Sequence, residues 1–199
     1  MATNRGKVKK TNLTDFDTTR KVGLNAIALD DDEDLIDVKL TNGETEIILA
    51  TRNGLAIRFC EKDVRPMGRT AHGVRGIQLS KDDIVVSMDT VQENGEVLTA
   101  TEEGMGKRTL ASEYRRQARG GKGVINLKVT EKTGKVVGAL VLLPQQEIIL
   151  ITAVGLIIRL TAEGISKFGR NAQGVRLINL NESDKVVAIA SVDSEVEEE

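Results

Sequence analysis

The chain has 199 residues, of which 40% are hydrophobic and only 2% aromatic, so we expect a core built from aliphatic side chains. The formal net charge is −2, and no apolar run approaches the roughly 18 residues that a membrane-spanning helix requires. The single cysteine, Cys60, excludes an internal disulfide, so the composition favours a protein of the reducing cytoplasm over a disulfide scaffold or a helical membrane protein.

One sequence pattern recurs four times along the chain, with a period of about 50 residues. Each copy has a threonine, two variable residues and a first glycine, and a second glycine follows further along. The first glycines are Gly6, Gly54, Gly104 and Gly155, and the second glycines are Gly23, Gly73, Gly123 and Gly174. Such a period is typical of repeated supersecondary units that share one continuous core.

Each repeat is predicted to contain four short strands, because short apolar runs are bounded by Gly, Asn and Asp. These strands are residues 47–51, 55–59, 74–79 and 84–88 in the second repeat, and 148–152, 156–160, 175–180 and 186–190 in the fourth. The Asn53-Gly54 pair predicts a hairpin turn between the first two strands. Only residues 109–116 could hold a helical turn. The sequence therefore predicts an all-β, β-propeller-like fold made of four-stranded blades, with four repeats visible.

We expect one repeat domain over residues 1–192, with blades at about 1–40, 46–89, 96–141 and 147–191. Only Met1, Ala2 and Thr3 precede the first turn, where the other repeats have a whole strand. The chain is therefore expected to be a piece of a longer array, and a closed ring of four blades is the alternative. Residues 193–199 form an acidic tail, which either shields a basic surface or acts as a solubilising end.

A basic residue stands four positions after every first glycine, and this register suggests an ordered row of positive charge. The row consists of Lys10, Arg58, Arg108 and Arg159. A second set surrounds the second glycines and comprises Arg20, Lys21, Arg69, Arg75, Arg119, Arg170 and Arg176. Glycine lets the backbone approach a phosphate, and a neighbouring cation neutralises the phosphate charge. The pattern therefore predicts binding of double-stranded DNA through its phosphates, with little reading of base sequence.

The third repeat carries the densest basic segment, which runs from Tyr114 to Gly123. Its predicted DNA-binding residues are Arg115, Arg116, Gln117, Arg119, Gly120, Gly121, Lys122 and Gly123. The segment resembles the Gln-Arg-Arg-Gly-Gly-Lys-Gly box of the C-terminal domain of the DNA gyrase A subunit, with Ala118 in place of the first arginine of the box. The segments Gly68–Arg75 and Gly169–Arg176 also resemble blades of that domain, so the resemblance covers essentially the whole chain.

This resemblance implies a β-pinwheel, a propeller-like fold whose blades exchange a strand with their neighbours. It also implies a module that wraps and bends DNA within a bacterial, cytoplasmic and nucleoid-associated topoisomerase. The implied partners are double-stranded DNA, the remainder of the gyrase A subunit and the gyrase B subunit, with no membrane. Because the box is imperfect and stands in the third visible repeat, we interpret it as a box-like copy in a later blade. The similar domain of the topoisomerase IV A subunit is the close alternative.

No catalytic residue, cofactor or metal site is predicted, so the chain alone is expected to be no enzyme. His72 is the only histidine, and Asp30–Asp34 lacks the spaced ligands and the glycine of a calcium loop. Tyr114 lies in the basic segment, which is not the setting of a DNA-cleaving tyrosine. The alternative function is a propeller that binds a protein, for which the loops offer only Met67, Tyr114 and Phe168 as anchors.

Overall fold

The computed structural model describes residues 1–19, 21–143 and 145–192, which form strands and short 3-10 turns without an α-helix. The strands of the first two repeats are β1 (Ala2–Thr3), β2 (Lys7–Val8), β3 (Leu35–Asp37), β4 (Glu46–Thr51), β5 (Leu55–Cys60), β6 (Val74–Arg75) and β7 (Val85–Val91). Those of the last two repeats are β8 (Glu96–Thr101), β9 (Met105–Leu110), β10 (Val124–Ile125), β11 (Val136–Leu142), β12 (Glu147–Thr152), β13 (Ile157–Thr161), β14 (Val175–Arg176) and β15 (Val186–Val192). The prediction of an all-β fold is confirmed.

The recurring threonine and first glycine build the hairpin turn of each repeat. In the second repeat, the Thr51 hydroxyl accepts a hydrogen bond from the Leu55 amide at 3.2 Å, and the Gly54 amide donates to the Thr51 carbonyl at 3.0 Å. Gly54 has a φ of 84°, in the left-handed region that glycine adopts without steric cost. The same threonine hydroxyl bond closes the turns at Thr3, Thr101 and Thr152. The predicted turn is therefore present in all four repeats.

The segment that carries the second glycine of each repeat is here called its strap. Strap 1 is residues 13–29, strap 2 is 61–79, strap 3 is 111–129 and strap 4 is 162–180. Each strap opens with a 3-10 turn, namely η1 (Leu13–Phe16), η2 (Glu61–Asp63), η3 (Ala111–Glu113) and η4 (Ala162–Gly164). The expectation that only residues 109–116 could hold a helical turn was therefore wrong.

The outer strand of a sheet comes from the strap of the following repeat. β6 of strap 2 pairs with β2, β10 of strap 3 pairs with β5, and β14 of strap 4 pairs with β9, all antiparallel. The sheets therefore have the orders β3-β1-β2-β6, β10-β5-β4-β7, β11-β8-β9-β14 and β13-β12-β15, the last with three strands among the described residues. This is the strand exchange that the resemblance to a β-pinwheel implied.

The exchanged strands are shorter than expected. Residues 74–79 and 175–180 were predicted to be strands, but only Val74–Arg75 and Val175–Arg176 are. The chain then bends over the turn of the preceding hairpin, since the Gly76 amide donates to the Gly6 carbonyl at 2.8 Å and the Leu177 amide donates to Gly104 at 2.8 Å. Straps 2, 3 and 4 are therefore each fixed to the turn glycine of the repeat before them.

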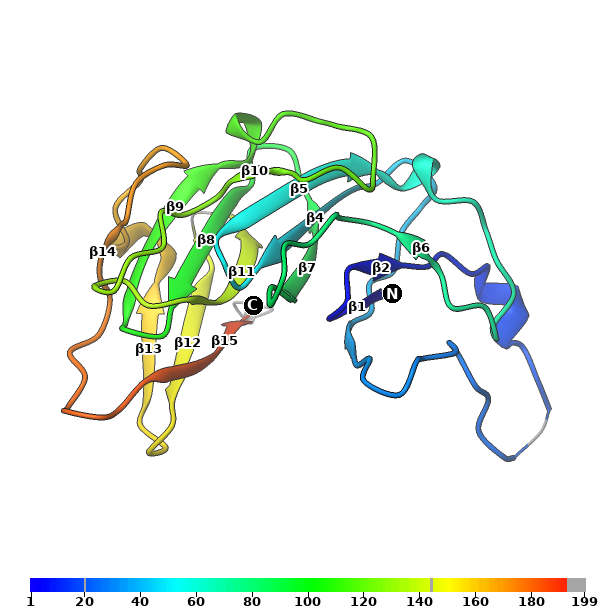
Figure 1. Ribbon diagram of the computed structural model, residues 1–199, viewed down its shortest axis with the longest axis horizontal. Helices are drawn as coiled ribbons and strands as arrows, with labels where there is room; N and C mark the ends of the chain where they lie inside the picture. Colours follow the sequence, from blue (N-terminus) through cyan, green and yellow to red (C-terminus); the bar gives the residue numbers. More distant parts are fainter. Residues whose placement is uncertain (20, 144, 193–199) are drawn as a thin grey trace, which may run out of the picture.

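Figure 1 shows the four sheets side by side in an open arc, with β1 and β2 near one end and β12 and β13 near the other, so the described residues do not form the closed ring considered as an alternative. Neighbouring sheets pack through their last strands, β3 on β7, β7 on β11 and β11 on β15. One buried cluster joins Val8 to Leu49 and Ile77, and another joins Leu98 to Leu150. A third cluster joins Ile48 to Val97, so each repeat shares buried side chains with the next. No helix among the described residues is long and apolar enough to span a bilayer.

Candidate nucleic-acid interface

Arg108 shows that the cations after the first glycines do not form a surface row. Its side chain is only 5% exposed, and Nη1 donates to Glu96 Oε2 at 2.7 Å. Its other nitrogens reach strap 4, where Nε donates to the Ile165 carbonyl at 2.8 Å and Nη2 to the Glu163 carbonyl at 3.1 Å. Arg108 therefore does not lie on the surface, because its hydrogen-bond donors are used inside the protein.

The equivalent cations of the other repeats occupy the same place. Arg58 pairs with Glu46 and donates to the Ala111 carbonyl of strap 3 at 2.7 Å. Lys10 donates to the Glu61 carbonyl of strap 2 at 3.0 Å. Arg159 pairs with Glu147, but no described strap covers this pair and the Arg159 side chain is 61% exposed. We call Lys10, Arg58, Arg108 and Arg159 the latch cations, since three of them fasten a repeat to the next strap.

Exposed cations are found on the straps instead. Arg75, Arg115 and Lys122 are exposed, and among the described residues no hydrogen-bond or ion-pair partner is found for their side chains. Lys21 is likewise exposed, whereas Arg20 lies outside the described residues. Arg116 is 58% exposed and lies 3.7 Å from Glu46. Exposed Arg176 donates to the Asn179 side chain at 3.3 Å.

Two strap arginines join consecutive straps to each other. Arg119 of strap 3 donates to the Arg75 carbonyl of strap 2 at 3.0 Å and to the Asp63 carbonyl at 2.8 Å. Arg170 of strap 4 repeats this contact, because it donates to the Ile125 carbonyl of strap 3 at 2.9 Å. Arg75 and Ile125 occupy the same position, two residues after the second glycine. Straps 2, 3 and 4 therefore form one connected band, which we call the strap band.

The box-like segment of strap 3 packs closely on the preceding repeat. In Figure 1 it extends above β5 before it enters β10. The Gly120 amide donates to the Gly76 carbonyl at 2.6 Å, and the Gln117 amide donates to the Arg58 carbonyl at 2.8 Å. Gly123 has a φ of 79°, and a Cβ there would lie 2.4 Å from the Ala56 oxygen. Gly121 is less constrained, since a Cβ would find its nearest neighbour at 3.7 Å.

Two buried lysines that the sequence analysis did not single out support the straps from beneath. Lys107 Nζ donates to the carbonyls of Gly169 at 2.7 Å and Arg170 at 2.9 Å, and to the Thr109 hydroxyl at 3.0 Å. Lys9 Nζ donates to the carbonyls of Arg69 and Ala26. Both lysines stand one residue before a latch cation, where the other repeats have isoleucine. A lysine at an otherwise apolar strand position was the sequence signal for this role.

Tyr114, which the sequence placed in the basic segment, is buried beneath it. Its hydroxyl donates to Asn126 Oδ1 at 2.6 Å, and burial raises the pKa of the phenol above its ordinary value. Tyr114 therefore anchors strap 3 in the core and presents nothing to a ligand. Cys60 is also buried.

Lys107 should make the stability of the domain depend on pH. Burial lowers the pKa of its ammonium group from 10.5 to about 8. Between these values the unfolded chain holds a proton that the folded chain has lost, so the free energy of unfolding should rise with pH, by up to about 3 kcal/mol. Urea unfolding at a series of pH values should show this rise in the wild type and a weaker one in Lys107→Met. Parallel curves for the two proteins would contradict the assignment.

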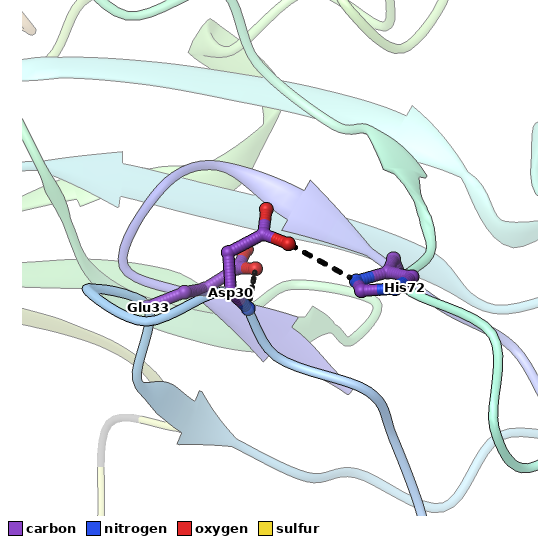
Figure 2. Close-up of side chains that lie close together, drawn as sticks. All are labelled: Asp30, Glu33 and His72. Carbon is purple, nitrogen blue, oxygen red and sulfur yellow. Dashed lines mark hydrogen bonds and ion pairs between the residues drawn. The ribbon is translucent and has the colours of Figure 1, made fainter.

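Asp30, Glu33 and His72 are the only group of potential metal ligands found in the described part of the chain, with ligand atoms within 4.8 Å of one another. Figure 2 shows Asp30 directed towards His72, at 3.4 Å. Lys7 Nζ donates to Asp30 Oδ2 at 2.6 Å and to Glu33 Oε2 at 2.8 Å. Burial raises the pKa of Glu33, but hydrogen bonds from Lys7 and Thr3 outweigh it and hold this pKa below its ordinary value. Lys7 thus bridges both carboxylates, and the three residues belong to an ion-pair cluster.

Four antiparallel sheets that exchange their outer strands, with a cationic band along the straps, define a propeller-type domain of the β-pinwheel class. The family model described as DNA gyrase C-terminal domain, beta-propeller, matches residues 1–42, 45–92, 95–142 and 146–193. The chain belongs to this family. The resemblance drawn from the box and the two glycine-arginine segments is therefore confirmed.

The relatives found by sequence are DNA gyrase A subunits. That of Halalkalibacterium halodurans is 58% identical over 196 residues, which is 98% of this chain and 24% of that protein. The chain spans about a quarter of the length of the curated relatives it matches. Among solved structures, the C-terminal domain of DNA topoisomerase IV has a TM-score of 0.91 at 29% identity, covering 96% of this chain and 60% of that one. The DNA gyrase A C-terminal domain has a TM-score of 0.86 at 29% identity, covering 96% and 64%.

Proposed function

We propose that the chain binds double-stranded DNA through its phosphates and bends or wraps it as a module of a DNA gyrase, contributing to supercoiling. The strap band is the observation that carries this proposal. It presents Arg75, Arg115 and Lys122, whose side chains have no partner in the described part of the chain, and it joins three successive straps by hydrogen bonds. Cations spaced along one connected backbone are suited to contact successive phosphates of a curved duplex.

The distribution of charge supports a mode of binding that is tolerant of sequence. The exposed cations lie beside glycines, where backbone amides can also approach a phosphate. Contacts to phosphate fix the position of a duplex but do not read its bases. Lys10, Arg58 and Arg108 are left out of this contact set, because their side chains donate hydrogen bonds inside the protein. The proposed contacts are therefore Lys21, Arg69, Arg75, Arg115, Arg116, Lys122 and Arg176, with Arg119 and Arg170 shaping the band.

In the intact enzyme we propose that the module acts with the remainder of the gyrase A subunit and with the gyrase B subunit, in the bacterial cytoplasm at the nucleoid. The chain itself would supply no catalytic residue, so its contribution would be the path of the DNA. The rival function, a protein-binding propeller, rested on three loop anchors. Of these, Tyr114 is buried, Met67 is half-buried and only Phe168 is exposed, which favours the DNA proposal.

Removing two strap cations should weaken DNA binding in a salt-dependent way. We expect the variant Arg115→Ala with Lys122→Ala to reduce the slope of log affinity against log salt by about 2, since each neutralised phosphate contributes about 0.9. Fluorescence anisotropy of a duplex of arbitrary sequence across a potassium chloride series measures this slope. Stability should change little, because both side chains are exposed.

The matched control removes equal charge elsewhere, with Lys81→Ala and Lys132→Ala. These exposed lysines lie between the strap and the last strand of repeats 2 and 3. Their removal should leave the slope nearly unchanged. Asp82 and Asp83 would be a poor control pair, because Asp83 is buried and accepts a hydrogen bond from the Asn53 amide. Equal slopes for the strap variant and the wild type would contradict the proposed contact set.

A further inference from the structure

The last strands of repeats 2 and 3, β7 and β11, meet on the concave side of the arc. They stand at the ends of the sheet orders β10-β5-β4-β7 and β11-β8-β9-β14, so the edge of β11 that faces away from β8 has no strand partner in the described residues. In Figure 1 they lie towards the inside of the arc, whereas the exchanged strands β10 and β14 lie towards its outside. An unpaired edge presents backbone amides that need other acceptors.

Two side chains of β7 supply these acceptors. Ser87 Oγ accepts a hydrogen bond from the Ala139 amide at 3.0 Å, and Asp89 Oδ2 accepts one from the Val141 amide at 2.8 Å. Ala139 and Val141 are only 4% and 7% exposed, so water does not replace these acceptors. A buried amide without an acceptor is costly, and the two bonds therefore hold β11 against β7. We call this pair of bonds the sheet joint.

Asp89 extends the sheet joint to a third repeat. Its other carboxylate oxygen, Oδ1, lies 3.2 Å from Lys39 Nζ of repeat 1 and accepts a hydrogen bond from the Thr90 amide at 2.9 Å. Burial lowers the pKa of Lys39, but the carboxylates of Asp89 and Asp37 outweigh it and raise this pKa above its ordinary value. One largely buried carboxylate thus contacts repeats 1, 2 and 3.

The next contact along the arc is built differently. The register of the last strands places Gly138 and Leu140 of β11 where β7 has Ser87 and Asp89. Neither offers a side-chain acceptor, and the Ile189 side chain of β15 packs against Gly138, where a Cβ would lie 2.8 Å from it. In the described part of the chain, the polar joint is therefore specific to repeats 2 and 3 and is not required by the fold.

Two bonds that lie two residues apart fix a direction as well as a distance. One bond alone would let the sheets rotate about it. On the outer side, the strap band sets the spacing of repeats 2 and 3, because Arg119 joins strap 3 to strap 2. The difference between the outer and the inner spacing determines the curvature. With strands about 4.8 Å apart, β10 lies about 14 Å from β7, and a rotation of about 10° at the joint would move β10 by about 2.5 Å relative to the sheet of repeat 3.

We propose that Ser87 and Asp89 set the curvature of the arc and thereby the bend that the strap band imposes on a bound duplex. The curvature belongs to the protein alone, whereas the bend rests on the proposed DNA binding. Neither residue would touch DNA, because both lie at the opposite end of the sheets from the exchanged strands. They are positioning residues, which act on the duplex through the spacing of the straps.

Small-angle X-ray scattering of the 199-residue chain without DNA tests the curvature. Asp89→Leu is similar in size but cannot accept from the Val141 amide, so the sheets should separate on the inner side and the radius of gyration should rise. Ser87→Ala removes the other acceptor and should give a smaller rise, and it carries the test if Asp89→Leu does not fold. Asp89→Asn keeps an acceptor oxygen for Val141 and should scatter like the wild type.

Thr99→Val is the matched control. It removes a buried hydrogen bond, from the Thr99 hydroxyl to Asn126, without touching the sheet joint. Its stability should fall while its scattering stays that of the wild type, which separates a change of shape from a loss of stability. Wild-type scattering from Ser87→Ala and from a folded Asp89→Leu would overturn the sheet joint. A rise for Asp89→Asn or Thr99→Val as large as that for Asp89→Leu would overturn it too.

The bend is measured separately, by energy transfer between dyes at the two ends of a duplex of about 40 base pairs, which is stiff because the persistence length of DNA is about 150 base pairs. Asp89→Leu should bind with the wild-type salt slope, since the strap cations are intact, but should bring the two ends less close together. Wild-type energy transfer at saturation, together with an increased radius of gyration, would overturn the role in bending. A wild type that does not bind the duplex would overturn the DNA proposal, while the scattering would still decide the sheet joint.

Discussion

Glu96→Ala should lower the free energy of unfolding by about 3–5 kcal/mol, which is the usual cost of removing one partner of a buried ion pair. Glu96 and Arg108 are both almost fully buried, and Lys167 also lies 2.6 Å from the second Glu96 oxygen. Without the carboxylate, the Arg108 guanidinium would remain under strap 4 with its charge uncompensated. Urea denaturation followed by circular dichroism measures the loss.

Glu147→Ala is the matched control for this effect. Glu147 stands in the same position of its repeat, twelve residues before its arginine as Glu96 is. Its pair with Arg159 is exposed, and exposed pairs contribute about 0–1 kcal/mol. The two substitutions thus differ only in whether a strap covers the pair. Equal losses of stability for the two variants would show that burial by the strap is not what makes the latch strong.

Gly174→Ala should also be severely destabilising, by about 3 kcal/mol or more. Gly174 has a φ of 83°, and a side chain in the left-handed region costs roughly 1–2 kcal/mol before any contact is considered. The added Cβ would in addition lie 2.2 Å from the Gly106 oxygen, so strap 4 would have to leave its hairpin. Thermal unfolding should show a clearly lowered midpoint.

Gly169→Ala, in the same strap, provides the comparison. A Cβ there would meet its nearest atom, Glu113 Oε2, at an ordinary 3.6 Å. Its stability should therefore stay within about 0.5 kcal/mol of the wild type. If Gly174→Ala were tolerated equally well, the close docking of strap 4 on β9 would be contradicted.

The features that the sequence could reveal are those set by neighbouring residues. The hairpin turns follow from the local Thr and Gly pattern, because Thr51 and Gly54 make their hydrogen bonds within a few residues. The repeat period and the class of fold followed from the recurrence of this pattern. The lengths of β6 and β14 could not be predicted from this pattern, because the turn of another repeat imposes the bend that follows them.

The role of the latch cations could not be read from their spacing. Arg108 and Arg159 have the same distance to their glycine and to their glutamate, yet one is buried and the other is 61% exposed. The difference is that strap 4, more than fifty residues after Glu96 in the sequence, covers Arg108, whereas no described strap covers Arg159. No local sequence pattern predicts this contact. Lys107 was overlooked for a related reason, since its partners are carbonyls about sixty residues further along.

The burial of the latches divides the positive charges of the domain into two populations that respond differently to ions. Mobile counterions screen the exposed charges of the strap band, but they have little access to the Arg108–Glu96 pair beneath strap 4. A rise in ionic strength would therefore release a bound polyanion while the arc kept its shape. If the proposed DNA binding holds, a duplex would then meet a surface that is already curved, and the protein would not have to be reordered to bind it.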